Sequence, residues 1–218
     1  MWIIPSISHS NPDRVMLSER EIADWAPHAR WATPAQIEQD LLITRGVGAI
    51  FNDSFLREQV AMRGGTVLQK VHLAPAARYS EDIDLVAVGN RPGGHLMQAL
   101  ERVLTPIMRA PPADGLIERV LLSIRNAALP SEIAKQTYEY APTGATRPSA
   151  RLKVEVNLTE RTPVFPVVTL PLQVDLPEGL TTFQVVSSGS ATSSAPKVTP
   201  MFIIWFRARS EVWMNVQR

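Results

Sequence analysis

Carboxylate side chains crowd together at the start of one short apolar segment. Residues 80–84 read Ser-Glu-Asp-Ile-Asp, and an apolar run follows them. If this segment forms a β-strand, as its β-branched composition predicts, Asp82 and Asp84 point to one side of the strand, away from the apolar side chains. Two carboxylates this close repel each other, so one would take up a proton unless a cation lies between them. Oxygen ligands without thiolates favour Mg²⁺ or Mn²⁺.

A third carboxylate lies in a later predicted strand. In residues 151–158 apolar side chains alternate with polar ones, and the polar face carries Lys153 and Glu155. If this strand neighbours the first, Glu155 joins Asp82 and Asp84. Three converging carboxylates can hold two metal ions, which would clamp the attacking and leaving oxygens of a phosphoryl transfer. On the bland interpretation, Lys153 only neutralises Glu155 and an Asp-x-Asp sequence is a solvated turn.

A Gly-Gly-Thr sequence precedes the carboxylates. Gly64 and Gly65 would let the backbone approach a ligand closely. A helix beginning at Thr66 would offer free amide N–H groups to phosphate oxygens, and the Thr66 hydroxyl would add a donor. Lys70 follows one helical turn later on the same face and could reach a triphosphate. Taken alone, Lys70 is equally a solvated helix residue.

The remaining pattern predicts mixed helices and strands, hence an α/β or α+β fold with a mixed sheet. Thr33 is a candidate N-cap for a helix that reaches residue 51, with Pro34 at its first position; Gly46 and Gly48 weaken its middle. Further helices are expected at residues 17–31, 54–61, 67–73 and 94–108, and strands at 82–88, 117–124, 133–142 and 150–160. We divide the chain into an N-terminal helical region (1–62), a core (63–176) and an atypical tail (177–218).

Composition excludes several classes of protein. The 218 residues include 45% hydrophobic ones and no cysteine, so disulfides, thiolate metal sites and cysteine nucleophiles are excluded. The formal net charge of +1 argues against a strongly basic nucleic-acid domain. We expect no membrane span and no secretory signal, because no apolar run reaches about 18–20 residues and no basic n-region precedes a long apolar one. A cytoplasmic protein is therefore expected.

The sequences RGGTVLQKVHL and RYSEDIDLV, together with RLKVEVNLTER, resemble the AbiEii/AbiGii family of nucleotidyltransferase toxins. These are the toxins of bacterial abortive-infection and toxin–antitoxin pairs. The resemblance runs from about residue 29 to residue 174. It covers the Gly-Gly-Thr sequence, the Asp82–Asp84 pair and Glu155 within Val-Glu-Val. It implies the DNA polymerase β-like nucleotidyltransferase fold, a mixed sheet with flanking helices.

The resemblance also implies an activity and roles for residues. The protein would transfer a nucleoside monophosphate from an NTP to an acceptor such as tRNA, and a cognate antitoxin would restrain it. Asp82, Asp84 and Glu155 would hold Mg²⁺ or Mn²⁺, and Glu155 would also help to activate the acceptor hydroxyl with assistance from Lys153. The triphosphate would lie against Gly64, Gly65, Thr66 and Lys70. Residues Ser80 and Glu81 are expected to shape the turn.

The C-terminal part departs from the family pattern. Members carry a Lys-containing helix and an Arg-Asp segment after the third carboxylate, and residues 181–198 match neither. One hypothesis is a change of reading frame, because one codon choice for residues 186–198 encodes a basic helix-like sequence in a second frame. Residues after about Gln184 would then pack loosely. The alternative function is a truncated, inactive remnant that still binds nucleotide or antitoxin; a metal-dependent phosphohydrolase is a weaker third.

Overall fold

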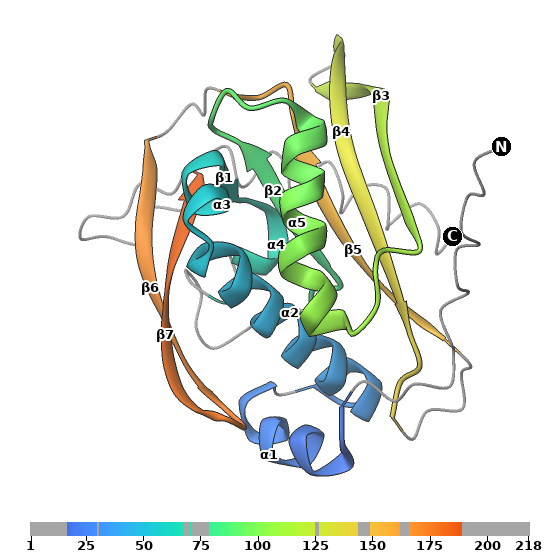
Figure 1. Cartoon of the computed structure of the whole chain (residues 1–218), viewed down its shortest axis with the longest axis vertical. Helices are drawn as coiled ribbons and strands as arrows, with labels where there is room; N and C mark the ends of the chain where they lie inside the picture. Colours follow the sequence, from blue (N-terminus) through green and yellow to red (C-terminus); the bar gives the residue numbers. More distant parts are fainter. Residues whose placement is uncertain are drawn as a thin grey trace, which may run out of the picture.

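A seven-stranded mixed sheet forms the centre of the molecule, and helices pack across one of its faces (Figure 1). The computed structural model describes residues 17–29, 31–67, 70, 79–124, 127–143, 149–161 and 166–188. The elements are α1 (Glu19–Ala29), α2 (Pro34–Asn52), α3 (Ser54–Gln59), β1 (Val60–Met62), α4 (Gly64–Val67), β2 (Asp82–Ala87), α5 (Gly93–Met108), β3 (Asp114–Ile124), β4 (Ala127–Tyr140), β5 (Ala150–Asn157), β6 (Val167–Leu176) and β7 (Gly179–Ser188). The expected α/β class with a mixed sheet is confirmed.

The order of the strands is β3-β4-β5-β2-β1-β7-β6. The pairs β2–β5 and β1–β7 are parallel, and the other neighbours are antiparallel. Strand β6 lies at one edge of the sheet, which is compatible with Pro171 inside it because a proline cannot donate to a second neighbour. The short central strand β2 therefore lies between β1 and β5, with the longest hairpin, β3–β4, beyond β5.

Helix α2 begins and packs as its sequence dictates. Thr33 caps it through a reciprocal pair of hydrogen bonds with Gln36, and Pro34 occupies the first turn. The two interior glycines, which the sequence predicts to weaken the helix, lie where it presses against the sheet. A β-carbon on Gly46 would lie 3.2 Å from Ile83, and one on Gly48 would lie 2.3 Å from the ring of Phe183. The two glycines lower the intrinsic helix propensity of α2, but they allow the helix to pack closely against the sheet.

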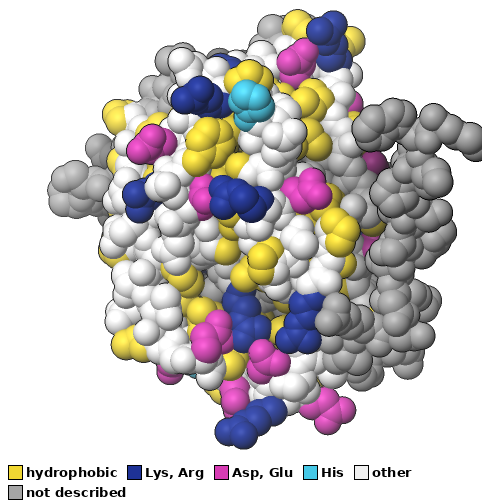
Figure 2. Space-filling model, viewed as in Figure 1, with side chains coloured by type: hydrophobic (Ala, Val, Ile, Leu, Met, Phe, Trp, Pro, Cys, Tyr) yellow, Lys and Arg dark blue, Asp and Glu magenta, His cyan; other side chains and the backbone are white. Residues whose placement is uncertain are grey.

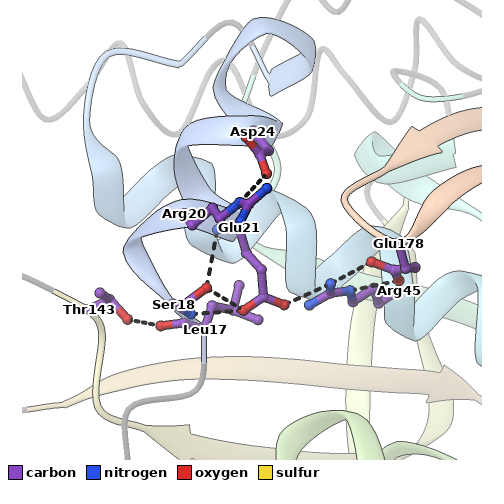
Figure 3. A network of polar contacts seen from close by, with 8 residues as sticks. All are labelled: Leu17, Ser18, Arg20, Glu21, Asp24, Arg45, Thr143 and Glu178. Atoms are coloured by element: carbon purple, nitrogen blue, oxygen red, sulfur yellow. Dashed lines mark hydrogen bonds and ion pairs between the residues drawn. The ribbon is translucent and has the colours of Figure 1, made fainter.

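An ionic network joins α2 to α1 and to the β6–β7 turn (Figure 3). The guanidinium of Arg45 contacts Glu21 of α1 at 2.9 Å and Glu178, in the β6–β7 turn, at 2.6 Å. The hydrogen bond from Arg45 lowers the pKa of the Glu178 carboxyl. Since the Arg45 side chain is only 16% exposed, this network holds α1 and the β6–β7 hairpin against one helix.

Charge on the helical side of the molecule is mixed. Figure 2 shows basic and acidic side chains interspersed over this face, with neither sign dominating. Within the described residues, no helix has the length and apolarity that crossing a membrane requires.

Several sequence predictions are corrected by the fold. The expected helix at residues 54–61 ends at Gln59, and β1 follows because residues 60–62 pair with β2 and β7. Most of the helix expected at 67–73 lies outside the described residues. The strands β6 and β7 were not predicted, because their pattern is interrupted by Pro171 and by short polar runs.

The expectation of a loose tail after Gln184 is wrong for residues 185–188. They complete β7, which is flanked by β1 and β6, and Val185, Val186 and Ser187 are buried. Residues 179–188 thus belong to the sheet rather than to an atypical tail beginning at 177. The remainder of that tail, residues 189–218, lies outside the described part of the chain.

We predict that Gly48→Ala lowers the free energy of unfolding by about 1–3 kcal/mol, as overpacking does in a close-packed core. The added methyl group would meet the Phe183 ring, which is itself buried. Urea unfolding followed by circular dichroism measures the change. Gly94→Ala in α5 is the matched control, since its β-carbon would meet nothing within 4 Å. Equal stabilities of the two variants would contradict the packing described for α2.

Candidate active site

The three predicted carboxylates lie on neighbouring strands in matching register. Strand β2 pairs with β5 in parallel, with Asp82 opposite Lys153 and Asp84 opposite Glu155. Residues paired in this way point to the same side of the sheet. The intervening Ile83 is fully buried and approaches Gly46 of α2. The carboxylates therefore point away from α2, and the adjacency of the two strands that the sequence analysis assumed is confirmed.

The Gly-Gly-Thr sequence, which forms the start of the short helix α4 and is called the loop below, lies directly against Asp84. Gly64 has a φ of +78°, a left-handed conformation that favours glycine. A β-carbon at this position would lie 2.2 Å from Oδ2 of Asp84, so only a residue without a side chain lets the loop approach the carboxylate so closely. The residue before Gly64 also contacts Asp84, because the backbone N–H of Arg63 donates to the carbonyl of Asp84 at 2.9 Å. The structure thus brings the predicted phosphate loop and metal ligand together.

The Thr66 hydroxyl is already engaged. It donates to the carbonyl of Asp82 at 2.6 Å and accepts from the Ser80 hydroxyl at 2.6 Å. A hydroxyl has one proton to donate, so this assignment uses it fully. Thr66 is fully buried. Its side chain therefore ties Thr66 to the start of β2, and the Ser80 hydroxyl takes part in the same contact.

Lys70 contacts α2 through its ammonium group. Nζ donates to Oδ1 of Asp40 at 2.8 Å and to the Thr44 hydroxyl at 2.8 Å. The second oxygen of Asp40 accepts from the indole of Trp25 at 2.9 Å. The Lys70 and Asp40 side chains are 12% and 5% exposed, so this is a largely buried ion pair. The sequence does not reveal Asp40 as the partner of Lys70, because it lies thirty residues away on α2.

A further lysine lies on the same face as the carboxylates. Lys135 on β4 is opposite Glu155 in register, and Nζ lies 3.7 Å from Oε1 of Glu155. The same ammonium makes an ion pair with Glu118 of β3. The hydrogen bond with Glu118 and the nearby Glu155 charge raise the pKa of Lys135. Sequence reasoning missed Lys135 because only the pairing of β4 with β5 brings it to this place.

The residues fit a hard divalent cation in chemistry and in strand register. Asp82, Asp84 and Glu155 supply only oxygen ligands, from one face of two adjacent strands. As the side chains are oriented, no group of three His, Asp or Glu residues among those described surrounds a metal position. The Glu155 carboxylate is instead turned toward Lys135. A separate pocket of about 520 Å³ lies between α1, α2, α5 and the β6–β7 hairpin, and it is not lined by Asp82, Asp84 or Glu155.

Comparison with known proteins gave a family and a structural likeness. Residues 47–191 match the family model described as nucleotidyl transferase AbiEii toxin, type IV toxin–antitoxin system. Among solved structures, the chain is similar to MenT4, a nucleotidyltransferase toxin from Mycobacterium tuberculosis H37Rv, with 20% identity and a TM-score of 0.43. That match covers 76% of this chain, which spans 54% of the MenT4 chain. Comparison with curated proteins gave no match.

We predict that Lys70→Met lowers the free energy of unfolding by about 3–5 kcal/mol, because it leaves the Asp40 charge buried without its cation. The double variant Asp40→Asn/Lys70→Met removes both charges while keeping an acceptor for Trp25. It is expected to recover most of the loss. Urea unfolding of the single and double variants measures both effects, and an additive loss in the double variant would contradict a coupled pair.

We predict that Gly64→Ala disturbs the site as well as the backbone. An alanine at φ +78° costs about 1–2 kcal/mol, and its methyl group would displace the Asp84 carboxylate. Gly179→Ala is the control, since its φ is +127° but nothing lies within 4 Å of the added methyl group. Both variants should unfold at lower urea concentration. If Asp84 holds a metal ion, only Gly64→Ala should weaken Mn²⁺ binding measured by electron paramagnetic resonance; equal weakening in Gly179→Ala would contradict a local effect of the contact.

Proposed function

The chain belongs to the AbiEii family of nucleotidyltransferase toxins of type IV toxin–antitoxin systems, and on this premise we propose that it transfers a nucleoside monophosphate from an NTP to an RNA acceptor such as tRNA. The observation that carries the proposal is the register of β2 and β5, which places Asp84 opposite Glu155 with the Gly64 loop against Asp84. This arrangement combines carboxylates with a close-approaching backbone on one face, which a phosphohydrolase would not require.

Each residue of the site has a role in this reaction. Asp82 and Asp84 would hold Mg²⁺ or Mn²⁺, with Glu155 as the third ligand. The ion would supply electrostatic stabilisation of the phosphate oxygens. Glu155 accepts the proton of the attacking hydroxyl. A bond forms between that hydroxyl oxygen and the α-phosphorus, the bond from the α-phosphorus to the bridging oxygen breaks, and pyrophosphate leaves with the electron pair.

The triphosphate lies along the loop in the proposed complex. Gly64 and Gly65 allow its oxygens to approach the backbone, while the Thr66 hydroxyl holds the loop to β2 rather than contacting phosphate directly. Lys70 uses its remaining N–H, since two of its three donors are engaged with α2. Lys153, exposed and opposite Asp82, lies where it can neutralise a phosphate oxygen. The double variant Asp40→Asn/Lys70→Met tests whether Lys70 contacts phosphate. Recovered stability together with weak NTP binding supports that contact. Recovered stability together with recovered NTP binding contradicts it.

A separately encoded antitoxin is the proposed protein partner, as the type IV toxin–antitoxin family description implies. Because the proposed substrates are an NTP and an RNA, we propose that the reaction takes place in the cytoplasm. Restraint of this reaction by the antitoxin between infections fits a role in abortive infection.

We predict that Asp84→Asn lowers transfer by at least about a hundredfold, because it removes a charged ligand from the shared face at nearly constant volume. The purified 218-residue chain is incubated with Mg²⁺, total tRNA and each α-³²P-labelled NTP in turn. Asp175→Asn is the matched control, since Asp175 is exposed on the edge strand β6.

The outcomes separate the two functions considered. Label on RNA that is lost in Asp84→Asn and kept in Asp175→Asn supports the transferase. Undiminished labelling by Asp84→Asn would contradict the metal-site assignment. An absence of label with every NTP, combined with Mg²⁺-dependent NTP binding, would identify an inactive remnant that retains the first half of the site.

A further inference from the structure

One side-chain amide of α2 bridges the two strands that carry the carboxylates. Nε2 of Gln39 donates to the carbonyl of Glu81 at 2.9 Å and to the carbonyl of Arg151 at 3.2 Å. Glu81 immediately precedes the first residue of β2, and Arg151 lies two residues before Lys153 on β5. A primary amide has two N–H donors, so Gln39 spends both of them on these two strand ends.

The amide itself is held in orientation from the other side. Its oxygen accepts a hydrogen bond from the hydroxyl of Tyr79 at 2.8 Å. Burial raises the pKa of Tyr79, so the phenol keeps the proton that it donates. The ring of Tyr79 packs edge-on against Trp31, which precedes the cap of α2. These contacts fix which end of the Gln39 amide faces the strands, and therefore make the bridge specific.

The bridge lies where the alignment of the carboxylates is decided. The β2–β5 ladder begins at the pair Asp82 and Lys153, immediately beyond the two carbonyls that Gln39 holds. Strand β2 is only six residues long. A slip of one residue between such strands turns every side chain to the opposite face, and a smaller displacement separates Asp84 from Glu155. Gln39 lies on α2 before residue 47, where the family match begins.

We propose that Gln39 is a positioning residue for nucleotidyl transfer: its amide sets the spacing of β2 and β5 at which Asp82, Asp84 and Glu155 act together on one metal-bound nucleotide. This inference rests on the proposed function. It assigns Gln39 no contact with substrate, since its effect passes through the carbonyls of Glu81 and Arg151 and the backbone that follows them.

The test replaces Gln39 without changing its size. Gln39→Glu removes both donors and sets a carboxylate against two carbonyl oxygens; Gln39→Met removes the donors without adding charge, and serves if the first variant fails to fold. Gln36→Ala is the matched control, because Gln36 is also a half-buried glutamine of α2 but its side chain bonds to Thr33 in the helix cap. The Gln36 and Gln39 variants all perturb α2. Only the Gln39 variants remove hydrogen bonds to the strand ends.

Three readouts on the full chain separate positioning from general stability. Amide hydrogen exchange, measured without metal, should be faster in residues 82–87 for the Gln39 variants than for Gln36→Ala. Mn²⁺ binding should weaken by about tenfold or more, the usual effect of losing support behind metal ligands. Transfer should show a comparable fall in kcat, with KM for the NTP within about twofold of the wild-type value.

Failure of this inference differs from failure of the proposed function. If the wild-type chain binds Mn²⁺ and transfers nucleotide, and the Gln39 variants do so equally well or Gln36→Ala is equally impaired, the positioning role is overturned while the function stands. If the wild-type chain neither binds Mn²⁺ through Asp84 nor transfers any nucleotide, the proposed function is overturned and the positioning role with it.

Discussion

The parallel pairing of β2 with β5 is the constraint on which the candidate site depends. The pairing places Asp84 opposite Glu155, although seventy-one residues separate them in the chain. Because side chains alternate along a strand, the same register that buries Ile83 and Val154 puts the carboxylates on the other face. Hydrophobic burial thus decides the position of the charged groups.

Helix α2 transmits this constraint to the rest of the molecule. Its N-terminal half carries Gln39, which bridges the ends of the two strands, and Asp40, which pairs with Lys70 beyond the loop. One turn later Arg45 holds α1 and the β6–β7 hairpin. Its glycines then press against β2 and β7. A capped helix that is fixed at both ends is a rigid reference, and the strands and the loop are aligned with it rather than with one another alone.

Local sequence patterns predict one part of this arrangement. Alternation within residues 82–87 and 151–158 was sufficient to put the carboxylates on one face of each strand, and the Thr33 cap was evident from its neighbours. The pairings of Lys135 with Glu155 and of Lys70 with Asp40 could not be found in this way. Each depends on which elements become neighbours, which periodicity does not encode. Strand β7 could not be predicted because short polar runs interrupt its alternation, and its pairing with β1 and β6 becomes evident only in the fold.

The contact between Lys135 and Glu155 explains how the two strands can be aligned while Glu155 is turned away from the aspartates. The ammonium makes its shorter ion pair with Glu118 and lies 3.7 Å from Glu155, and both of the groups in the longer contact are about one-third exposed. A pair of this kind contributes only about 0–1 kcal/mol. Turning the Glu155 side chain toward the aspartates would therefore cost little, because Lys135 keeps Glu118 as its partner and the backbone register does not change. The strands supply the alignment, and the Glu155 side chain can turn without any change in the register of β2 and β5.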